Sequence, residues 1–97
     1  MDRQTTLHKA SEIARSLVTV GNALMGPGMA TYQPERDTVE FYLYDYQGDR
    51  VEHFRFEATR HEYVIHDVLA DAERSRTNTP DRALGTWASH ILGYLTD

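Results

Sequence analysis

Apolar residues recur every three or four positions along the first part of the chain. This spacing, from Thr6 to Met25, is typical of an amphipathic helix whose apolar stripe is wide enough to cover a sheet. The next residues are Gly26-Pro27-Gly28, and they should end the helix, because glycine suits the left-handed position after a helix and proline cannot continue one. The stripe consists of Leu7, Ala10, Ala14, Leu17, Gly21 and Leu24, with Ile13 and Val20 beside it.

The pattern changes to alternation in the middle of the chain, which predicts strands. Two runs alternate in this way, Val39 to Tyr46 and Val51 to Ala58, and Gly48 between them allows the turn of a β-hairpin. Met29 to Tyr32 is compatible with a short edge strand that precedes the hairpin. The apolar face of the hairpin would carry Val39, Phe41, Leu43, Phe54 and Phe56.

Two registers of this hairpin satisfy the pattern. One pairs Leu43 with Phe54, which matches apolar partners, and the other pairs Phe41 with Phe54 and Glu40 with Arg55, which also matches charges. The two registers differ by two residues, so each side chain faces the same side of the sheet in both.

Two further helices are expected in the last third of the chain. Thr59 and Glu62 have the spacing of a capping box, and Thr79 and Pro80 have the typical sequence of a helix start. The two helices would form an αα-hairpin. Their buried stripes would be Tyr63, Ile65, Val68, Leu69 and Ala72 in the first helix, and Ala83, Leu84, Trp87, Ala88, Ile91 and Leu95 in the second.

The sequence therefore predicts one α+β domain over its 97 residues, with the element order α-β-β-(β)-α-α. In this fold a small antiparallel β-meander packs against an N-terminal helix and a C-terminal αα-hairpin.

The charge of the chain is unevenly distributed. The net charge is −5, but residues 35–73 contain eleven Asp and Glu against four Arg, a local net charge of −7. An acidic surface of this kind repels phosphate and would attract a partner with a basic surface, although solubility alone also accounts for it. No apolar run is long enough to span a membrane, and charges interrupt the N-terminus where a secretory signal would be apolar. We expect a cytoplasmic protein with no membrane association.

Candidate chemistry is sparse. The chain has no cysteine, which excludes disulfides, thiol catalysis and cysteine-rich zinc sites. The five histidines never form the i, i+4 pair of a helical metal site, and neither a nucleophile elbow nor a phosphate loop is present. Asp67 and Asp71 would share one face of the second helix, where exposed acids are ordinary. We expect no catalytic residue, no cofactor and no metal site.

The unusual feature is the second face of the hairpin. Tyr42, Tyr44 and Tyr46 would lie there in a row, opposite the apolar face. Tyrosine combines an apolar body with a polar tip, so a group of tyrosines suits a surface that is wet when free and dry when bound. The same row has two ordinary structural causes, which stay open: tyrosine favours strands in general, or a helix crosses this face and buries it.

The function that this face predicts is non-catalytic binding of a partner protein or of a second copy of the chain, as a regulator, an inhibitor or an assembly subunit. Two alternatives are a small enzyme or metal-dependent protein that uses His, Asp and Glu of the middle segment, and a single-strand nucleic-acid binder. The acids around the aromatic residues argue against nucleic acid as a partner. The predicted binding residues are Tyr42, Tyr44, Tyr46, Val51, His53, Arg55, Glu40 and Asp49.

Overall fold

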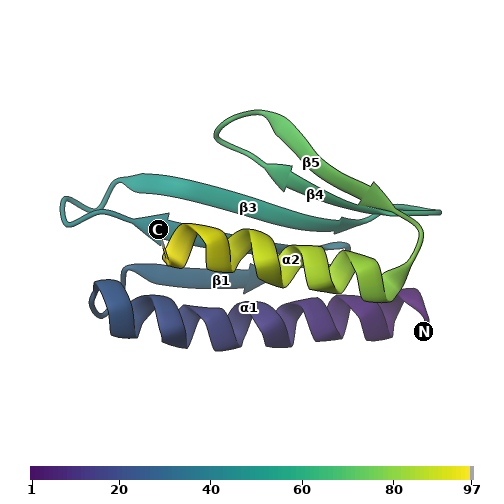
Figure 1. The fold of residues 1–97 in the computed structure, drawn as a ribbon, viewed down its shortest axis with the longest axis horizontal. Coiled ribbons are helices and arrows are strands. Elements are labelled where there is room, and N and C mark those ends of the chain that lie inside the picture. The colour runs from purple at the N-terminus through teal and green to yellow at the C-terminus, as the bar shows by residue number, and fades with distance from the viewer. Residues whose placement is uncertain (97) are drawn as a thin grey trace.

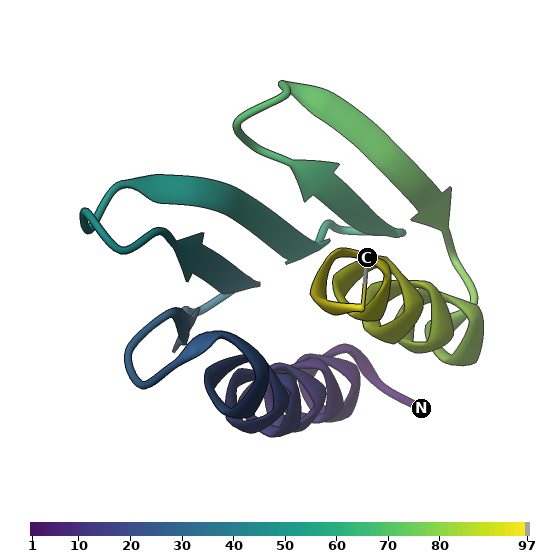
Figure 2. The ribbon, with the colours of Figure 1, turned by 60° about the vertical axis from the view of Figure 1, so that its left-hand side comes forward.

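The computed structural model describes residues 1–96. The chain begins with helix α1, continues through five strands and ends with helix α2, and each strand pairs antiparallel with the next, in the order β1-β2-β3-β4-β5. Both helices lie side by side along one face of the sheet, and the described chain places no helix on the opposite face (Figures 1 and 2). The elements are α1 Arg3–Met25, β1 Ala30–Pro34, β2 Thr38–Tyr44, β3 Arg50–Ala58, β4 Tyr63–Asp67, β5 Ala72–Thr77 and α2 Pro80–Leu95.

The core fills the space between the sheet and the two helices. Small residues let α1 approach closely: a Cβ atom added at Gly21 would lie 2.9 Å from the Cβ of Ala30 in β1. Trp87 of α2 is fully buried and its Nε1 donates a hydrogen bond to the Ala10 carbonyl oxygen of α1 (3.1 Å), which ties the helices together. The sheet contributes the apolar face predicted from the alternation: Val39, Phe41, Leu43, Phe54 and Phe56.

The helix ends follow from local chemistry. Helix α1 begins earlier than predicted, because Asp2 Oδ1 accepts a hydrogen bond from the backbone N–H of Thr5 (2.7 Å) and caps the first turn. It ends at Met25 as predicted, where Gly26 takes a φ of 122°. Helix α2 begins at Pro80, also as predicted. Within residues 1–96, neither helix has the length and apolar composition needed to cross a membrane.

The structure confirms the α+β class, the N-terminal helix, the antiparallel meander and the last helix. The prediction of the other helix, the first of the αα-hairpin, is wrong. That segment forms strand β4 and the turn that leads into strand β5. Thr59 Oγ1 does accept from the Glu62 backbone N–H (3.0 Å), as a capping box requires, but the Thr59 N–H also donates to the Glu62 carbonyl oxygen (2.8 Å). This reciprocal pair closes a turn that sends the chain back as a strand. Asp67 and Asp71 therefore share no helix face: Asp67 is buried in β4, and Asp71 lies in the turn before β5.

The β2–β3 hairpin adopts one of the two predicted registers, with Phe41 opposite Phe54. Near the turn, Tyr44 pairs with Arg50, which leaves Val51 as the extra residue of a β-bulge. The short edge strand predicted before the hairpin is confirmed as β1.

Candidate functional site

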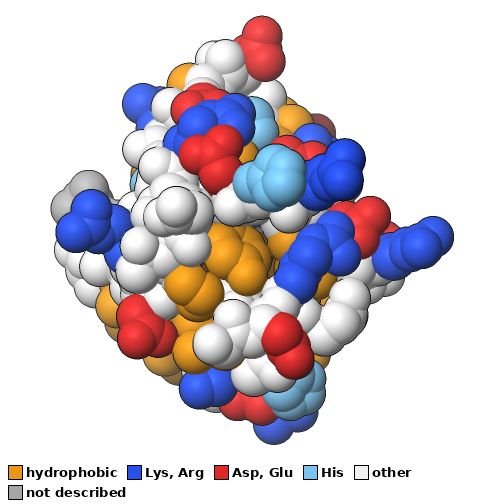
Figure 3. Space-filling model, turned by 90° about the vertical axis from the view of Figure 1, so that its right-hand side faces the viewer, with side chains coloured by type: hydrophobic (Ala, Val, Ile, Leu, Met, Phe, Trp, Pro, Cys, Tyr) orange, Lys and Arg blue, Asp and Glu red, His pale blue; other side chains and the backbone are white. Residues whose placement is uncertain are grey.

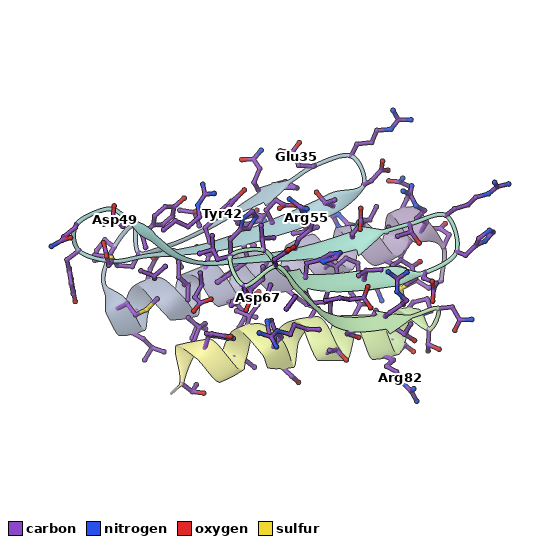
Figure 4. The ribbon with its side chains drawn as sticks, turned by 90° about the horizontal axis from the view of Figure 1, so that it is seen from above. Glu35, Tyr42, Asp49, Arg55, Asp67 and Arg82 are labelled. Carbon is purple, nitrogen blue, oxygen red and sulfur yellow. The ribbon has the colours of Figure 1, made fainter. Side chains whose placement is uncertain are left out.

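The face of the sheet that the helices leave uncovered, here called the open face, carries the residues predicted to bind a partner. Figure 4 looks down on the sheet and shows Tyr42 and Arg55 over its central strands, with Asp49 at the hairpin end. We call one half of this face the aromatic–arginine patch. It consists of Tyr42, Tyr44, Arg50, His53 and Arg55.

The patch is built around Tyr42. The Arg50 guanidinium carbon lies 4.3 Å from the centre of the Tyr42 ring, and the His53 ring lies 4.5 Å from it, centre to centre. The Tyr44 ring is 6.3 Å away. Burial, and next to it the nearby Glu40 carboxylate, raise the pKa of the Tyr42 phenol above its ordinary value. The cation–π contact and the ring contacts hold the aromatic groups in place before any partner arrives.

Glu40 lies beneath the patch and is almost fully buried. Its Oε1 lies 2.7 Å from His53 Nε2 and 2.9 Å from Arg55 Nε, across the β2–β3 pairing. Burial by itself would raise the pKa of this carboxyl, but hydrogen bonds from Thr38, His53 and Arg55 outweigh it and lower the pKa. Glu40 is therefore an ionised, internally neutralised anchor for two residues of the patch.

The other half of the open face is closed by its own ion pairs. Arg76 of β5 bonds Glu62 (3.1 Å) and Glu73 (2.6 Å), and His66 Nε2 lies 3.7 Å from a Glu57 oxygen. These long side chains cover Val64, which is fully buried although no helix packs on this side. We call this region the ion-paired half. Figure 3 views one end of the molecule, where acidic, basic and histidine side chains are interspersed around an apolar centre.

The structure brings together most, but not all, of the predicted binding residues. Tyr42, Tyr44, His53 and Arg55 share the open face as expected, but His53 is buried there rather than exposed to a partner. The predicted position of Tyr46 is wrong: β2 ends at Tyr44, so Tyr46 lies in the turn, where its side chain is largely exposed and its hydroxyl donates to the Met25 carbonyl oxygen at the end of α1 (3.1 Å).

The remaining predicted residues lie around the patch. Val51 is the partly exposed bulge residue, Asp49 is exposed in the turn, and Glu40 is buried rather than part of an exposed acidic rim. Arg50 belongs to the patch and was missed. The signal was available, because an arginine opposite a tyrosine in an antiparallel pair can lay its guanidinium over aromatic rings.

A second polar cluster lies on the helix side, under the β4–β5 hairpin. Asp67 Oδ2 contacts Arg74 Nη2 (3.3 Å) and the Tyr94 hydroxyl (3.4 Å), so it links both strands to α2. Burial lowers the pKa of the adjacent His90. Burial also raises the pKa of Glu52, and the nearby Asp67 carboxylate raises it further. Residues 1–96 contain no group of three or more His, Asp or Glu side chains placed to hold a metal ion.

A hollow of about 330 Å³ lies between α1 and the β1–β2 turn. Leu7 and Val39 form its apolar floor, and His8 at its rim is paired with Glu12 (2.7 Å). The polar groups around it do not converge on one point in the way that a small-molecule site requires.

Comparison with known proteins identifies no relative: no family model matches the chain, and no curated protein or solved structure is significantly similar to it.

Proposed function

We propose that this protein is a non-catalytic interaction module, a cytoplasmic regulator, inhibitor or assembly subunit, that binds a partner protein through the aromatic–arginine patch. The observation that carries the proposal is the cluster in which the Arg50 guanidinium and the His53 ring both contact the Tyr42 ring, on a sheet face that no helix of the described chain covers. Tyrosine and arginine are the residue types that most often dominate binding energy at protein interfaces.

The rigidity of the patch supports the same conclusion. Tyr42 and His53 project from paired positions on neighbouring strands, and His53 and Arg55 are held by Glu40. A partner would meet the Tyr42 and Arg55 side chains, which the buried His53 and Glu40 already hold in place, so less conformational entropy is lost on binding.

The charge of the patch favours a different protein over a second copy of this chain. In a two-fold self-contact centred on the patch, Arg50 and Arg55 of one copy would face the same residues of the other. Like charges opposed across an interface destabilise it, so a heterologous partner fits better.

A photo-crosslinking experiment tests the proposal. The crosslinking amino acid p-benzoylphenylalanine would replace Tyr44 on the open face or, as a control, Leu69, which is exposed in the turn between β4 and β5. We expect one partner to be crosslinked in the source cells from position 44 and not from position 69.

That partner, once purified, should lose at least about tenfold in affinity for the Tyr42→Ala variant, as expected for a residue that dominates the interface. Tyr46→Ala is the matched control, because it removes the same side chain from the turn instead of the patch. If Tyr42→Ala binds as tightly as the wild type, or if the only crosslinked product is a dimer of this chain, the proposed function is wrong.

A further inference from the structure

The acids that surround the patch in the sequence do not surround it in space. Glu40 is buried and bonded to His53 and Arg55. The carboxylate of Asp45 is engaged in the turn, where its Oδ1 accepts hydrogen bonds from the backbone N–H groups of Gln47 and Asp49 (2.9 Å each).

Two further acids lie outside the patch. Glu52 pairs with Leu43 and therefore faces the helix side of the sheet, whereas Glu57 follows Arg55 on the open face of β3 and borders the patch beside His66. Asp49 is the remaining acid of this group, exposed at the hairpin end.

The arginines of the patch, in contrast, keep free hydrogen-bonding capacity. Within residues 1–96 the arginines that form ion pairs are Arg3, Arg55, Arg74 and Arg76, so the exposed Arg50 has no carboxylate partner. Arg55 bonds Glu40 through Nε only, and its side chain is 38% exposed. Because Arg55 balances the charge of Glu40, the unpaired Arg50 leaves the patch with a net positive charge, although the segment that contains it has a net charge of −7.

We propose that the patch selects an acidic segment of its partner, with carboxylates against Arg50 and Arg55 and apolar groups against the Tyr42 and Tyr44 rings. This inference rests on the proposed function and reverses the preference for a basic partner that the sequence suggested. Guanidinium–carboxylate hydrogen bonds are among the strongest polar contacts at interfaces, and arginine combines them with aromatic stacking.

The same chemistry would attract phosphate, but the surroundings favour a peptide. A nucleic-acid strand that continued across the sheet would enter the ion-paired half, where the carboxylates of Glu57, Glu62 and Glu73 lie around Arg76 and His66. Strand binding needs several phosphate contacts in a continuous basic groove. A protein segment can instead place one or two carboxylates at the patch and neutral residues beyond it.

Peptides of one background sequence and different charge test this inference. The probes are three fluorescein-labelled 12-residue peptides, each with two tyrosines and with four Glu, four Gln or four Lys at the same positions, and a 12-nucleotide oligo-dT. Fluorescence anisotropy gives the affinities, and amide chemical shifts locate the binding. We expect the Glu peptide to bind most tightly and to shift the amides of Tyr42, Tyr44 and His53.

The variant Arg50→Ala should weaken binding of the Glu peptide by about tenfold or more, the range for a lost hydrogen bond to a charged group. The matched control is Arg82→Ala, which removes the same charge from an exposed site on α2, away from the open face (Figure 4). Arg50 makes no ion pair, so its removal leaves the buried Glu40 network intact.

Three results would overturn the acidic preference: equal binding of the Gln peptide, tighter binding of the Lys peptide or oligo-dT, or no amide shift on the open face with the Glu peptide. None of them decides the proposed function, which depends on the crosslinked partner and on Tyr42. If the Glu peptide binds most tightly but the crosslinked partner binds Tyr42→Ala as tightly as the wild type, the acidic preference stands and the proposed function is wrong.

Discussion

Replacement of Glu40 by glutamine would measure how strongly the patch is anchored to the sheet. The substitution keeps the shape of the side chain and removes its charge. Glu40 is 7% exposed and His53 is 9% exposed, so their contact lies out of water, whereas Arg55 is 38% exposed and partly screened. Two opposing effects follow: the variant avoids the cost of burying a carboxylate, but its hydrogen bonds to His53 and Arg55 become weaker.

The pKa of Glu40 indicates which effect is larger. Because the pKa is lowered on folding, the folded protein stabilises the charged form more than water does, and removal of the charge should destabilise the fold. A hydrogen bond to a charged group contributes about 1 kcal/mol more than a neutral one, and the Arg55 share is reduced by exposure, so the expected loss is about 1.5 kcal/mol. For a domain of this size, that loss lowers Tm by roughly 6–12 °C.

Urea unfolding at a series of pH values would test this expectation. The difference between wild type and Glu40→Gln should be full at pH 7 and should decrease below pH 4.5, the ordinary pKa of the group, as protonation removes the charge from the wild type. Glu73→Gln is the control: its bond to Arg76 is shorter, at 2.6 Å, but both side chains are more than 40% exposed, so no measurable change is expected. A Glu40→Gln protein as stable as the wild type at pH 7, or more stable, would refute the reasoning.

Four further predictions concern stability, and thermal or urea unfolding checks each. Gly21→Ala should destabilise by about 1–3 kcal/mol because its Cβ would meet that of Ala30 at 2.9 Å, and unchanged stability would mean that α1 shifts freely. Gly93→Ala, with open space around it in α2, should instead stabilise by up to about 1 kcal/mol, and a loss would contradict the helix argument. Glu52→Gln should stabilise at pH 7, since burial raises the pKa of this carboxyl, and the gain should vanish below pH 4.5, where the folded and unfolded wild type both carry the proton. Trp87→Phe should cost about 2–4 kcal/mol through a cavity and the lost bond to the Ala10 carbonyl oxygen, and a smaller cost would mean that the core repacks.

The elements with strong local patterns could be predicted, and the error in element type, a helix predicted where β4 forms, has a local cause. The predicted hydrogen bond between Thr59 and Glu62 forms, but a hydrogen bond with this spacing can either begin a helix or close a turn. The apolar positions that follow, Tyr63 and Ile65, are two residues apart and fit a strand better than a helix, and the β-branched and aromatic residues there favour a strand as well.

Strand β5 could not be predicted from its own residues. It consists of Ala72, Glu73, Arg74, Ser75, Arg76 and Thr77, with no apolar alternation. Its strand conformation depends on hydrogen bonds to β4 and on the turn at Asp71, whose φ is 51°. Such pairing depends on tertiary contacts, so the pattern of hydrophobic residues in the sequence does not predict it.

The sign of the charge at the candidate site was the property that was hardest to predict from the sequence. The sequence correctly placed Tyr42, Tyr44, His53 and Arg55 on one face, because alternation alone fixes the face. Counting acids along the same segment then suggested an acidic surface. A charge affects a partner through its exposed, unpaired part, however, and folding determines that part by burying Glu40, engaging Asp45 in a turn and directing Glu52 to the helix side. A local excess of acids along a chain therefore does not establish an acidic interface until the partners of each carboxylate are known.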